Sequence, residues 1–579
     1  MITQKLFFGA LVSLTILAPA TARTEAYAVP PLADVVHHPN AGREGMVAAE
    51  EKIAAQVGAE ILAKGGNAVD AAVASAFAMA VTYPRAGNIG GGGFMLVHLA
   101  DENKTVAIDY RESAPAAASA DMYLDENGDV VPGAATTTLL AAGVPGTVAG
   151  LLYALENYGT MSRREVIAPA IRLAAKGYPM TYFLAAMIED YREELSKDEA
   201  AFAELFKPNG AGYLPGEIHK RPDLARTLKK IAKKGRAGFY AGDVAEAIAD
   251  AMAANDGLIT MDDLADYKVI EREPVRGTYR GYEVVSMPPP SSGGVHLIQM
   301  LNMLETRPPH RSAGDSAEYL HFLAEVMRRA YADRAEHLGD IDFVDVPVEG
   351  LISKNYAVSL ASTIGTRAGK SSAIGAGDPP AEESPETTQI SVIDKDGNMV
   401  SNTYTINLSF GSRIVVPGTG IFLNNEMDDF SAKPGFANSY GLIGNEKNAI
   451  APGKRPLSSM TPALVFKDGN PMMATGAPGG ARIITAVLNV ILNVIDREMN
   501  IGDATDQPRI HHQWLPDVIL YEPGLSDDTK ALLEAKGHEL IPFNWLARPQ
   551  TVRVRDGWYY GYTDERQPAG GACSADGGC

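Results

Sequence analysis

The feature that most constrains the fold is an abrupt change of sequence character at Thr387. The preceding residues, 365–386, read GTRAGKSSAIGAGDPPAEESPE and contain almost no large apolar side chain. This small, polar, proline-containing composition is typical of an exposed linker. After Thr387 apolar and polar residues alternate, which is typical of a β-strand. The sequence therefore predicts a strand that begins directly after an exposed connection.

The turn that follows predicts how this strand is paired. Residues 395–398 read KDGN, which is turn chemistry, and residues 400–406 read as a second strand. If the loop has three residues with Gly397 in the left-handed conformation, antiparallel partners have numbers that sum to 792, so Thr387 faces Thr405. A two-residue loop would slip the register by one and place Ile406 opposite Thr387 instead.

Two helices and two short strands are predicted near the N-terminus. Apolar residues recur at helical spacing over 53–61 and again over 69–77, and Asn67 between them is a typical N-cap. Alternation over 95–98 and 105–110 indicates strands on either side of a turn.

The first 22 residues have the pattern of a secretory signal peptide. Lys5 supplies a positive charge, residues 6–17 are apolar, and residues 20–22 read ATA, a small-residue cleavage site. The alternative is a retained anchor helix, although the apolar stretch is short for a membrane span. Export predicts a periplasmic or secreted protein.

The net charge of the whole chain argues against some classes of partner, and its cysteines leave the presence of a disulfide open. A formal net charge of −20 argues against nucleic acid or an anionic membrane as a partner. The only cysteines, Cys573 and Cys579, lie in a glycine-rich tail. They either close a small disulfide loop or are two free thiols on a loose end, and the sequence does not decide between these.

Thr387 also has a possible chemical role. If the chain is cut before it, its new α-amine, with a pKa of about 8, can act as general base for its own hydroxyl. The alternative is that Thr387 and Thr388 are ordinary β-branched strand residues.

The surrounding motifs decide between these interpretations. The segments IGGGGFM, IDYRESAP, MPPPSSGG, AYADRAEHLGD, SPETTQISVIDKDGNMVSNTYTINLSFG, GIFLNNEMDDFS, GKRPLSSMTPALV, GAPGGARI and PRIHHQWLPD occur in this order. Together they closely resemble the bacterial γ-glutamyltransferase family of the N-terminal-nucleophile hydrolase superfamily. The resemblance implies an α+β fold with four αββα layers and self-cleavage between Glu386 and Thr387. It further implies a helix-rich large subunit, residues 23–386, that stays associated with a small subunit, residues 387–579.

The resemblance also implies residue roles that are chemically sensible. Thr387 would be the nucleophile and Thr405 would orient it, while backbone amides of Gly479 and Gly480, before a helix that begins near Ala481, would stabilise the oxyanion. An amino-acid head group requires donors for its carboxylate and acceptors for its ammonium. The donors would be Arg111, Ser458 and Ser459, and the acceptors Asn407, Glu426 and Asp429. Residues 433–451 would form a lid that closes through Tyr440.

The implied activity is cleavage of the γ-glutamyl amide of glutathione and related compounds through a threonine ester, with transfer to water or to amino acids and peptides. No cofactor is implied, and no metal is expected, because the adjacent pair His511-His512 has no third ligand nearby in the sequence. One alternative is a glutaryl or cephalosporin acylase on the same fold, whose substrate lacks the α-ammonium. A second is a non-catalytic exported binding protein that never cleaves itself.

Overall fold

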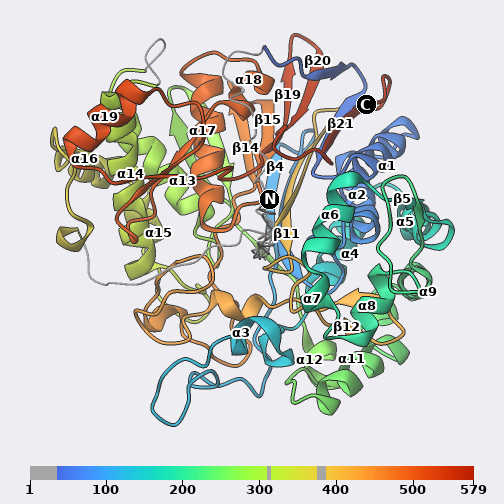
Figure 1. The fold of residues 1–579 in the computed structure, drawn as a ribbon. Coiled ribbons are helices and arrows are strands. Elements are labelled where there is room, and N and C mark those ends of the chain that lie inside the picture. Colours follow the sequence, from blue (N-terminus) through green and yellow to red (C-terminus); the bar gives the residue numbers. More distant parts are fainter. Residues whose placement is uncertain (1–35, 310–314, 375–386) are drawn as a thin grey trace, which may run out of the picture.

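Two large antiparallel sheets lie at the centre of the structure (Figure 1), a computed structural model that describes residues 36–309, 315–374 and 387–579. The α+β class expected from the sequence is confirmed. The predicted signal peptide, residues 1–22, and residues 375–386 of the predicted linker, including Glu386, lie outside the described residues. Within the described ranges, every helix falls short of the length or hydropathy that crossing a bilayer requires.

The first sheet has seven strands. Their spatial order is β21 (Gly571–Ser574), β2 (Gly45–Ala49), β10 (Thr388–Asp394), β11 (Met399–Thr405), β3 (Gly92–Leu99), β4 (Lys104–Tyr110) and β7 (Ile270–Arg272). Strands from before and after Thr387 are therefore neighbours, since β2 pairs with β10 and β11 pairs with β3.

The second sheet also has seven strands. Their order is β1 (Asn40–Gly42), β20 (Trp558–Thr563), β19 (Gln550–Arg555), β15 (Asn470–Gly476), β14 (Ala463–Lys467), β9 (Tyr282–Ser286) and β8 (Val275–Tyr279). Strands β10 and β11 of the first sheet pack against β15 of this one, so the two sheets lie face to face.

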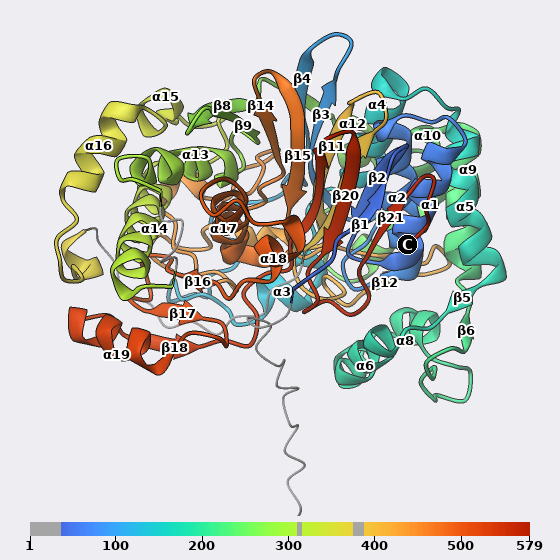
Figure 2. The same ribbon diagram turned by 90° about the horizontal axis from the view of Figure 1, so that it is seen from above.

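Helices cover the outer face of each sheet (Figure 2). Strands of the first sheet contact α2 (Ala68–Thr82) and α4 (Thr147–Tyr158), and strands of the second contact α13 (Gly293–Leu304) and α17 (Ile483–Ile495). Helix α2 is buried along its whole length and is rich in alanine, which lets it lie close to both the sheet and α1 (Lys52–Ala63). Its start follows the sequence expectation, because the Asn67 side chain accepts from the amides of Val69 and Asp70 in a capping box.

The β10–β11 hairpin has the register predicted from a three-residue loop. Thr388 pairs with Tyr404, whose numbers sum to 792, and Gly397 has a left-handed φ of +88°. Glycine adopts this conformation at little cost, so the turn chemistry sets the register. The alternative two-residue loop, which would place Ile406 opposite Thr387, is wrong.

The C-terminal tail is part of the core. Residues Gly571–Ser574 form β21, which pairs with β2, and Cys573 is fully buried. Cys573 and Cys579 are joined by a disulfide. Of the two possibilities that the sequence left open, the structure has the disulfide, and the tail is not a loose end.

Candidate active site

One cavity brings together all but one of the described residues that the sequence assigned to the site. Its lining comprises Arg111, Thr387, Thr405, Asn407, Glu426, Asp429, Tyr440, Ser458, Ser459 and Gly480, with Leu442, Met460, Ala481 and Ile483. Gly479 lies beside this lining rather than in it. The free volume is about 20 Å³, enough for about one water molecule. The site is therefore closed in this structure.

Thr387 and Thr405 lie at the end of the hairpin that faces the cavity. Thr387 directly precedes β10 and is 4% exposed, and continuation of the ladder places it opposite Thr405. The Thr405 hydroxyl accepts from the backbone N–H of Asn407 at 2.8 Å. Asn407 has a left-handed φ of +71°, and the chain turns at this residue after the end of β11. The strand pairing thus positions both hydroxyl-bearing residues.

Arg111 is buried at the polar end of the cavity. Its guanidinium pairs with the carboxylates of Glu426 and Asp429, and its Nε donates to the carbonyl of Pro456 at 3.3 Å. Burial disfavours the charged form, but the surrounding carboxylates outweigh it and raise the pKa of Arg111 above its usual value. In this closed arrangement, the predicted donor to a substrate carboxylate and two predicted acceptors of a substrate ammonium satisfy one another.

Two further acidic residues belong to this end of the site, although the sequence analysis assigned neither. Burial raises the pKa of Glu112, next to Arg111, to about 7. Burial and the neighbouring charge of Asp429 raise the pKa of Asp428 to about 7 as well. Asp428 accepts from the backbone N–H of Ser439 at 3.2 Å. The sequence feature that could have identified Glu112 and Asp428 is their position next to Arg111 and Asp429.

Asn407 offers an acceptor that nothing in the described part of the chain uses. Its Nδ2 donates to the carbonyl of Asn425 at 2.9 Å, whereas its buried Oδ1 has no hydrogen-bond partner among the described residues. A buried amide oxygen without a donor is costly, so it marks a place for a donor from elsewhere.

One of the two predicted site serines, Ser459, is held by an arginine that was not predicted from the sequence. Arg334 donates from Nη2 to Ser459 Oγ at 3.1 Å and from Nε to Ser292 Oγ at 2.9 Å. Ser458 Oγ accepts from the backbone N–H of Met460 at 3.1 Å. Burial lowers the pKa of Arg334 to about 10, which leaves it charged at neutral pH. The sequence feature that could have identified Arg334 is its position in the AYADRAEHLGD motif, to which no role was assigned.

The Gly479-Gly480 pair requires glycine for two reasons. Both residues have positive φ, +145° and +55°. A Cβ on Gly480 would lie 2.3 Å from the ring of Tyr440. A short 3₁₀ turn, Gly480–Arg482, then leads into α17, which begins at Ile483, two residues after the predicted start. Gly480, Ala481 and Ile483, at this helix start, line the cavity.

The predicted lid, residues 433–451, lies over the cavity through Tyr440. Its hydroxyl donates to the carbonyl of Asn407 at 2.9 Å, and its own carbonyl accepts from Gln513 at 3.1 Å. Asn438 donates to Asp429 at 3.0 Å. Tyr440 is only 4% exposed, and the predicted lid contacts two residues that line the cavity, Asn407 and Asp429.

Comparisons with known proteins show which family this chain belongs to. The family model described as gamma-glutamyltranspeptidase matches residues 54–574. The glutathione hydrolase proenzyme of Escherichia coli is 49% identical over 92% of this chain and 92% of its own. The acylase ACY 1 proenzyme of a Pseudomonas strain is 40% identical over 89% and 90%. A crystal structure of cephalosporin acylase from Bacillus halodurans superposes with a TM-score of 0.82 at 28% identity, covering 97% of this chain and 99% of that one. The chain therefore belongs to the γ-glutamyltranspeptidase family.

Proposed function

We propose that the protein removes γ-glutamyl groups from glutathione and related amides, with Thr387 as nucleophile, and transfers them to water or to amino acids and peptides. The observation that carries this proposal is one buried cavity that holds Thr387, Thr405, a charged arginine and two acids. The greater identity to a glutathione hydrolase proenzyme than to an acylase proenzyme supports it. We assign the fold to the four-layer αββα type of N-terminal-nucleophile hydrolases.

The active form requires a cut between Glu386 and Thr387. Cleavage gives a large subunit, residues 23–386, and a small subunit, residues 387–579, which remain a heterodimer because their strands alternate in the first sheet. The freed α-amine of Thr387 takes the proton of its own hydroxyl. The signal peptide, residues 1–22, directs the protein to the periplasm or the exterior.

The charge balance of the site favours an amino-acid head group. A zwitterion adds one negative and one positive group, so its carboxylate takes the place of an acid on Arg111 while its ammonium contacts the released acids. Asn407 Oδ1 supplies a further acceptor for the ammonium. The Ser459 hydroxyl, held by Arg334, and the Ser458 hydroxyl face the carboxylate. The net charge of the buried site is then unchanged by binding, which avoids the cost of an unpaired charge.

The reaction proceeds by acyl transfer in two steps. The Thr387 hydroxyl oxygen attacks the γ-carbonyl, the amides of Gly479 and Gly480 stabilise the oxyanion, and the C–N bond breaks as the leaving amine takes the proton from the α-ammonium. The γ-glutamyl ester on Thr387 is then attacked by water or by an acceptor amine, which gives up a proton to the α-amine, and the resulting α-ammonium returns that proton to the Thr387 oxygen as the C–O bond breaks. Thr405 holds the nucleophile in place throughout.

The alternative of a glutaryl or cephalosporin acylase is favoured by the acylase relatives. Glutaryl amides lack the α-ammonium, so binding them would leave the acids Glu426 and Asp429 without a cationic partner. The rates of hydrolysis of γ-glutamyl-p-nitroanilide and glutaryl-p-nitroanilide, measured under the same conditions, distinguish the two functions. We expect hydrolysis of the γ-glutamyl compound to dominate, and a preference for the glutaryl compound would contradict the proposal.

The test of cleavage uses Thr387→Ala with Thr388→Ala as a matched control in the next position. Denaturing gels should show two fragments for the wild type and for Thr388→Ala, the smaller beginning at Thr387 by N-terminal sequencing. Thr387→Ala should remain one full-length chain without activity. A wild type that stays intact would instead support the non-catalytic binding protein, and cleavage in Thr387→Ala would refute the assignment of the nucleophile.

A further inference from the structure

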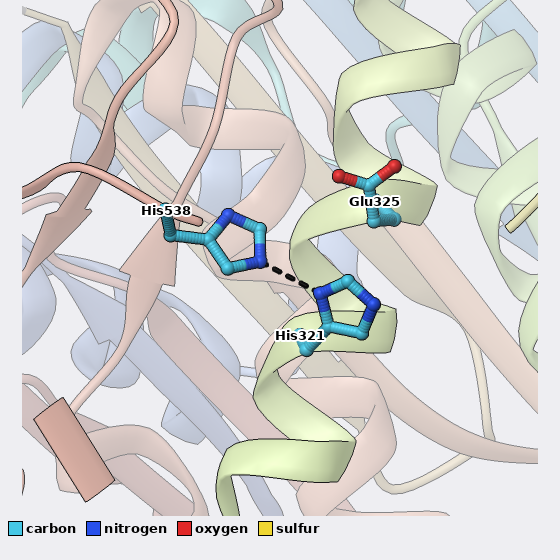
Figure 3. Close-up of side chains that lie close together, drawn as sticks. All are labelled: His321, Glu325 and His538. Atoms are coloured by element: carbon cyan, nitrogen blue, oxygen red, sulfur yellow. Dashed lines mark hydrogen bonds between the residues drawn. The ribbon is translucent and has the colours of Figure 1, made fainter. Parts of the chain in front are cut away.

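A buried cluster of two histidines and a glutamate lies away from the active site. His321 and Glu325 are four residues apart on α14 (Ala317–His337), so they share one face of the helix. His538, which follows α19 (Asp527–Lys536), approaches that face (Figure 3). All three side chains are buried, and one ligand atom from each lies within 4.8 Å of the others.

The hydrogen bonds of His321 show which of its nitrogens carries a proton. Its Nε2 lies 2.9 Å from the carbonyl oxygen of Gly365, which can only accept, so Nε2 bears the hydrogen and Nδ1 has the lone pair. That lone pair faces His538 Nε2 at 2.7 Å (Figure 3). Donation of the distal ring N–H to a backbone carbonyl is the arrangement that orients metal-bound histidines.

His538 is left with an unsatisfied atom in this arrangement. To donate to His321 it must be protonated at Nε2, so the lone pair lies on its buried Nδ1, which has no hydrogen-bond partner among the described residues. A cation between the two rings would be bound by a ring-nitrogen lone pair from each histidine. His538 would then bind through Nε2 and carry its hydrogen on Nδ1, with no net change in protons.

We propose that His321, Glu325 and His538 bind one transition-metal dication of the Zn²⁺ class. Two imidazoles and a carboxylate are the ligands that Zn²⁺ takes in proteins, with a water molecule in the fourth position. Tetrahedral coordination at about 2.05 Å requires ligand atoms about 3.3 Å apart. The two ring nitrogens must therefore separate slightly and the carboxylate must move toward them.

The charges around Glu325 affect how strongly the site binds. Glu325 pairs with Arg328 at 3.2 Å and Arg329 at 2.7 Å, and Arg328 also pairs with Asp517. These two arginines and two acids balance, so the cation adds its charge to a neutral group. The carboxylate must be shared with the arginines, which weakens binding compared with a site of unpaired ligands.

The cluster joins segments on opposite sides of Thr387. His321 and Glu325 precede it and His538 follows it, so a bound cation would link the two subunits of the proposed processed form. The site is also separate from the catalytic cavity. Tyr331, which donates to the carbonyl of the cavity residue Ala481, is ten residues farther along α14 than His321, or about 15 Å at 1.5 Å per residue.

This cluster departs from the expectation of no metal, because its ligands are not close in sequence. His321 and His538 are 217 residues apart, and only the packing of α14 against α19 brings them together. The adjacent pair on which that expectation rested, His511-His512, is not part of the cluster.

The test measures metal binding on protein without a histidine tag. After dialysis against a chelator, Zn²⁺ is titrated in competition with a chromogenic chelator, and Co²⁺ is added separately to record its visible absorption. We expect one equivalent of either ion in the wild type and a four-coordinate Co²⁺ spectrum. His538→Ala should abolish the spectrum and weaken Zn²⁺ binding more than ten-fold, since loss of an outer-shell partner alone costs 10–100-fold.

Three further variants make the result specific. Glu325→Gln preserves side-chain size and should weaken metal binding. It provides a second test if His538→Ala fails to fold, and γ-glutamyl-anilide activity checks the folding of each variant. His38→Ala removes an exposed histidine and should bind like the wild type. His37→Ala tests the other group of potential ligands, His37, Asp506 and Glu565. A wild type that binds no more metal than His538→Ala, or binding lost only in His37→Ala, overturns the proposal.

Discussion

The contact between Gly480 and Tyr440 provides the sharpest test of how the proposed lid and the proposed oxyanion-binding turn are coupled. In Gly480→Ala, the added Cβ would lie 2.3 Å from Cδ1 and 2.4 Å from Cε1 of Tyr440, whereas ordinary contact begins at 3.4 Å. The ring must therefore move by about 1.1 Å (3.4 Å minus 2.3 Å). That movement would disturb the hydrogen bond from its hydroxyl to the Asn407 carbonyl.

Two costs add in this variant, and only one involves Tyr440. The left-handed φ of +55° costs a residue with a Cβ about 1–2 kcal/mol. Overpacking against the ring and the weakened hydrogen bond cost about 1–3 kcal/mol more. If both costs raise the free energy of the transition state, kcat/KM falls by roughly 30- to 5000-fold, at 1.36 kcal/mol for each factor of ten.

The assay is a double-mutant cycle on γ-glutamyl-p-nitroanilide with Gly480→Ala, Tyr440→Ala and the double variant, each corrected for the fraction of cleaved chain. Removal of the ring should relieve the overpacking but not the φ cost. We expect a coupling energy of about 1–3 kcal/mol, that is, the double variant five- to 150-fold more active than additivity predicts. Gly479→Ala is the matched control, since its Cβ would meet Ala547 at 2.9 Å instead. Additivity within about 0.5 kcal/mol in the Gly480 cycle would refute the reasoning.

Three other changes have expected results. Arg111→Lys keeps the charge but loses the planar fork, so KM for the γ-glutamyl substrate should rise about 10–100-fold in steady-state kinetics, and an unchanged KM would exclude Arg111 from binding. The pKa of about 7 at Asp428 means that its carboxylate becomes a weaker acceptor for the Ser439 amide as pH falls through 7. KM should therefore rise less below pH 7 in Asp428→Asn than in the wild type, where Glu112 titrates in the same range, and parallel pH profiles would contradict this. Glu522→Gln weakens a fully buried ion pair with Arg509, so the free energy of unfolding should drop by about 3–5 kcal/mol, seen as a lower urea midpoint; an unchanged midpoint would show that the pair contributes little.

Local chemistry made parts of this fold predictable from the sequence. The Asn67 cap and the Gly397 turn each act over a few residues, so both the start of α2 and the register of the β10–β11 hairpin could be worked out in advance. The predicted site residues meet in one cavity because that hairpin and the turn at Gly480 both end there.

Non-local packing was not predictable in the same way. Strand β10 has β2 as its second neighbour, more than 300 residues earlier, and the tail strand β21 joins the same sheet from the C-terminus. Neither pairing can be predicted from the spacing of nearby residues. Arg334 and Asp428 were missed for the same reason, since their importance lies in what they contact across the cavity.

The alternation of strands from the two sides of Thr387 has a consequence for heat inactivation. Before the cut, unfolding and refolding involve one covalent chain and can reverse. After it, unfolding separates two polypeptides that must find each other again and thread their strands between one another, so recovery becomes second order and competes with aggregation. Cleavage before Thr387 would thus convert reversible unfolding into irreversible loss of folded protein. The lifetime of the mature enzyme would then be set by its rate of unfolding rather than by its free energy of unfolding.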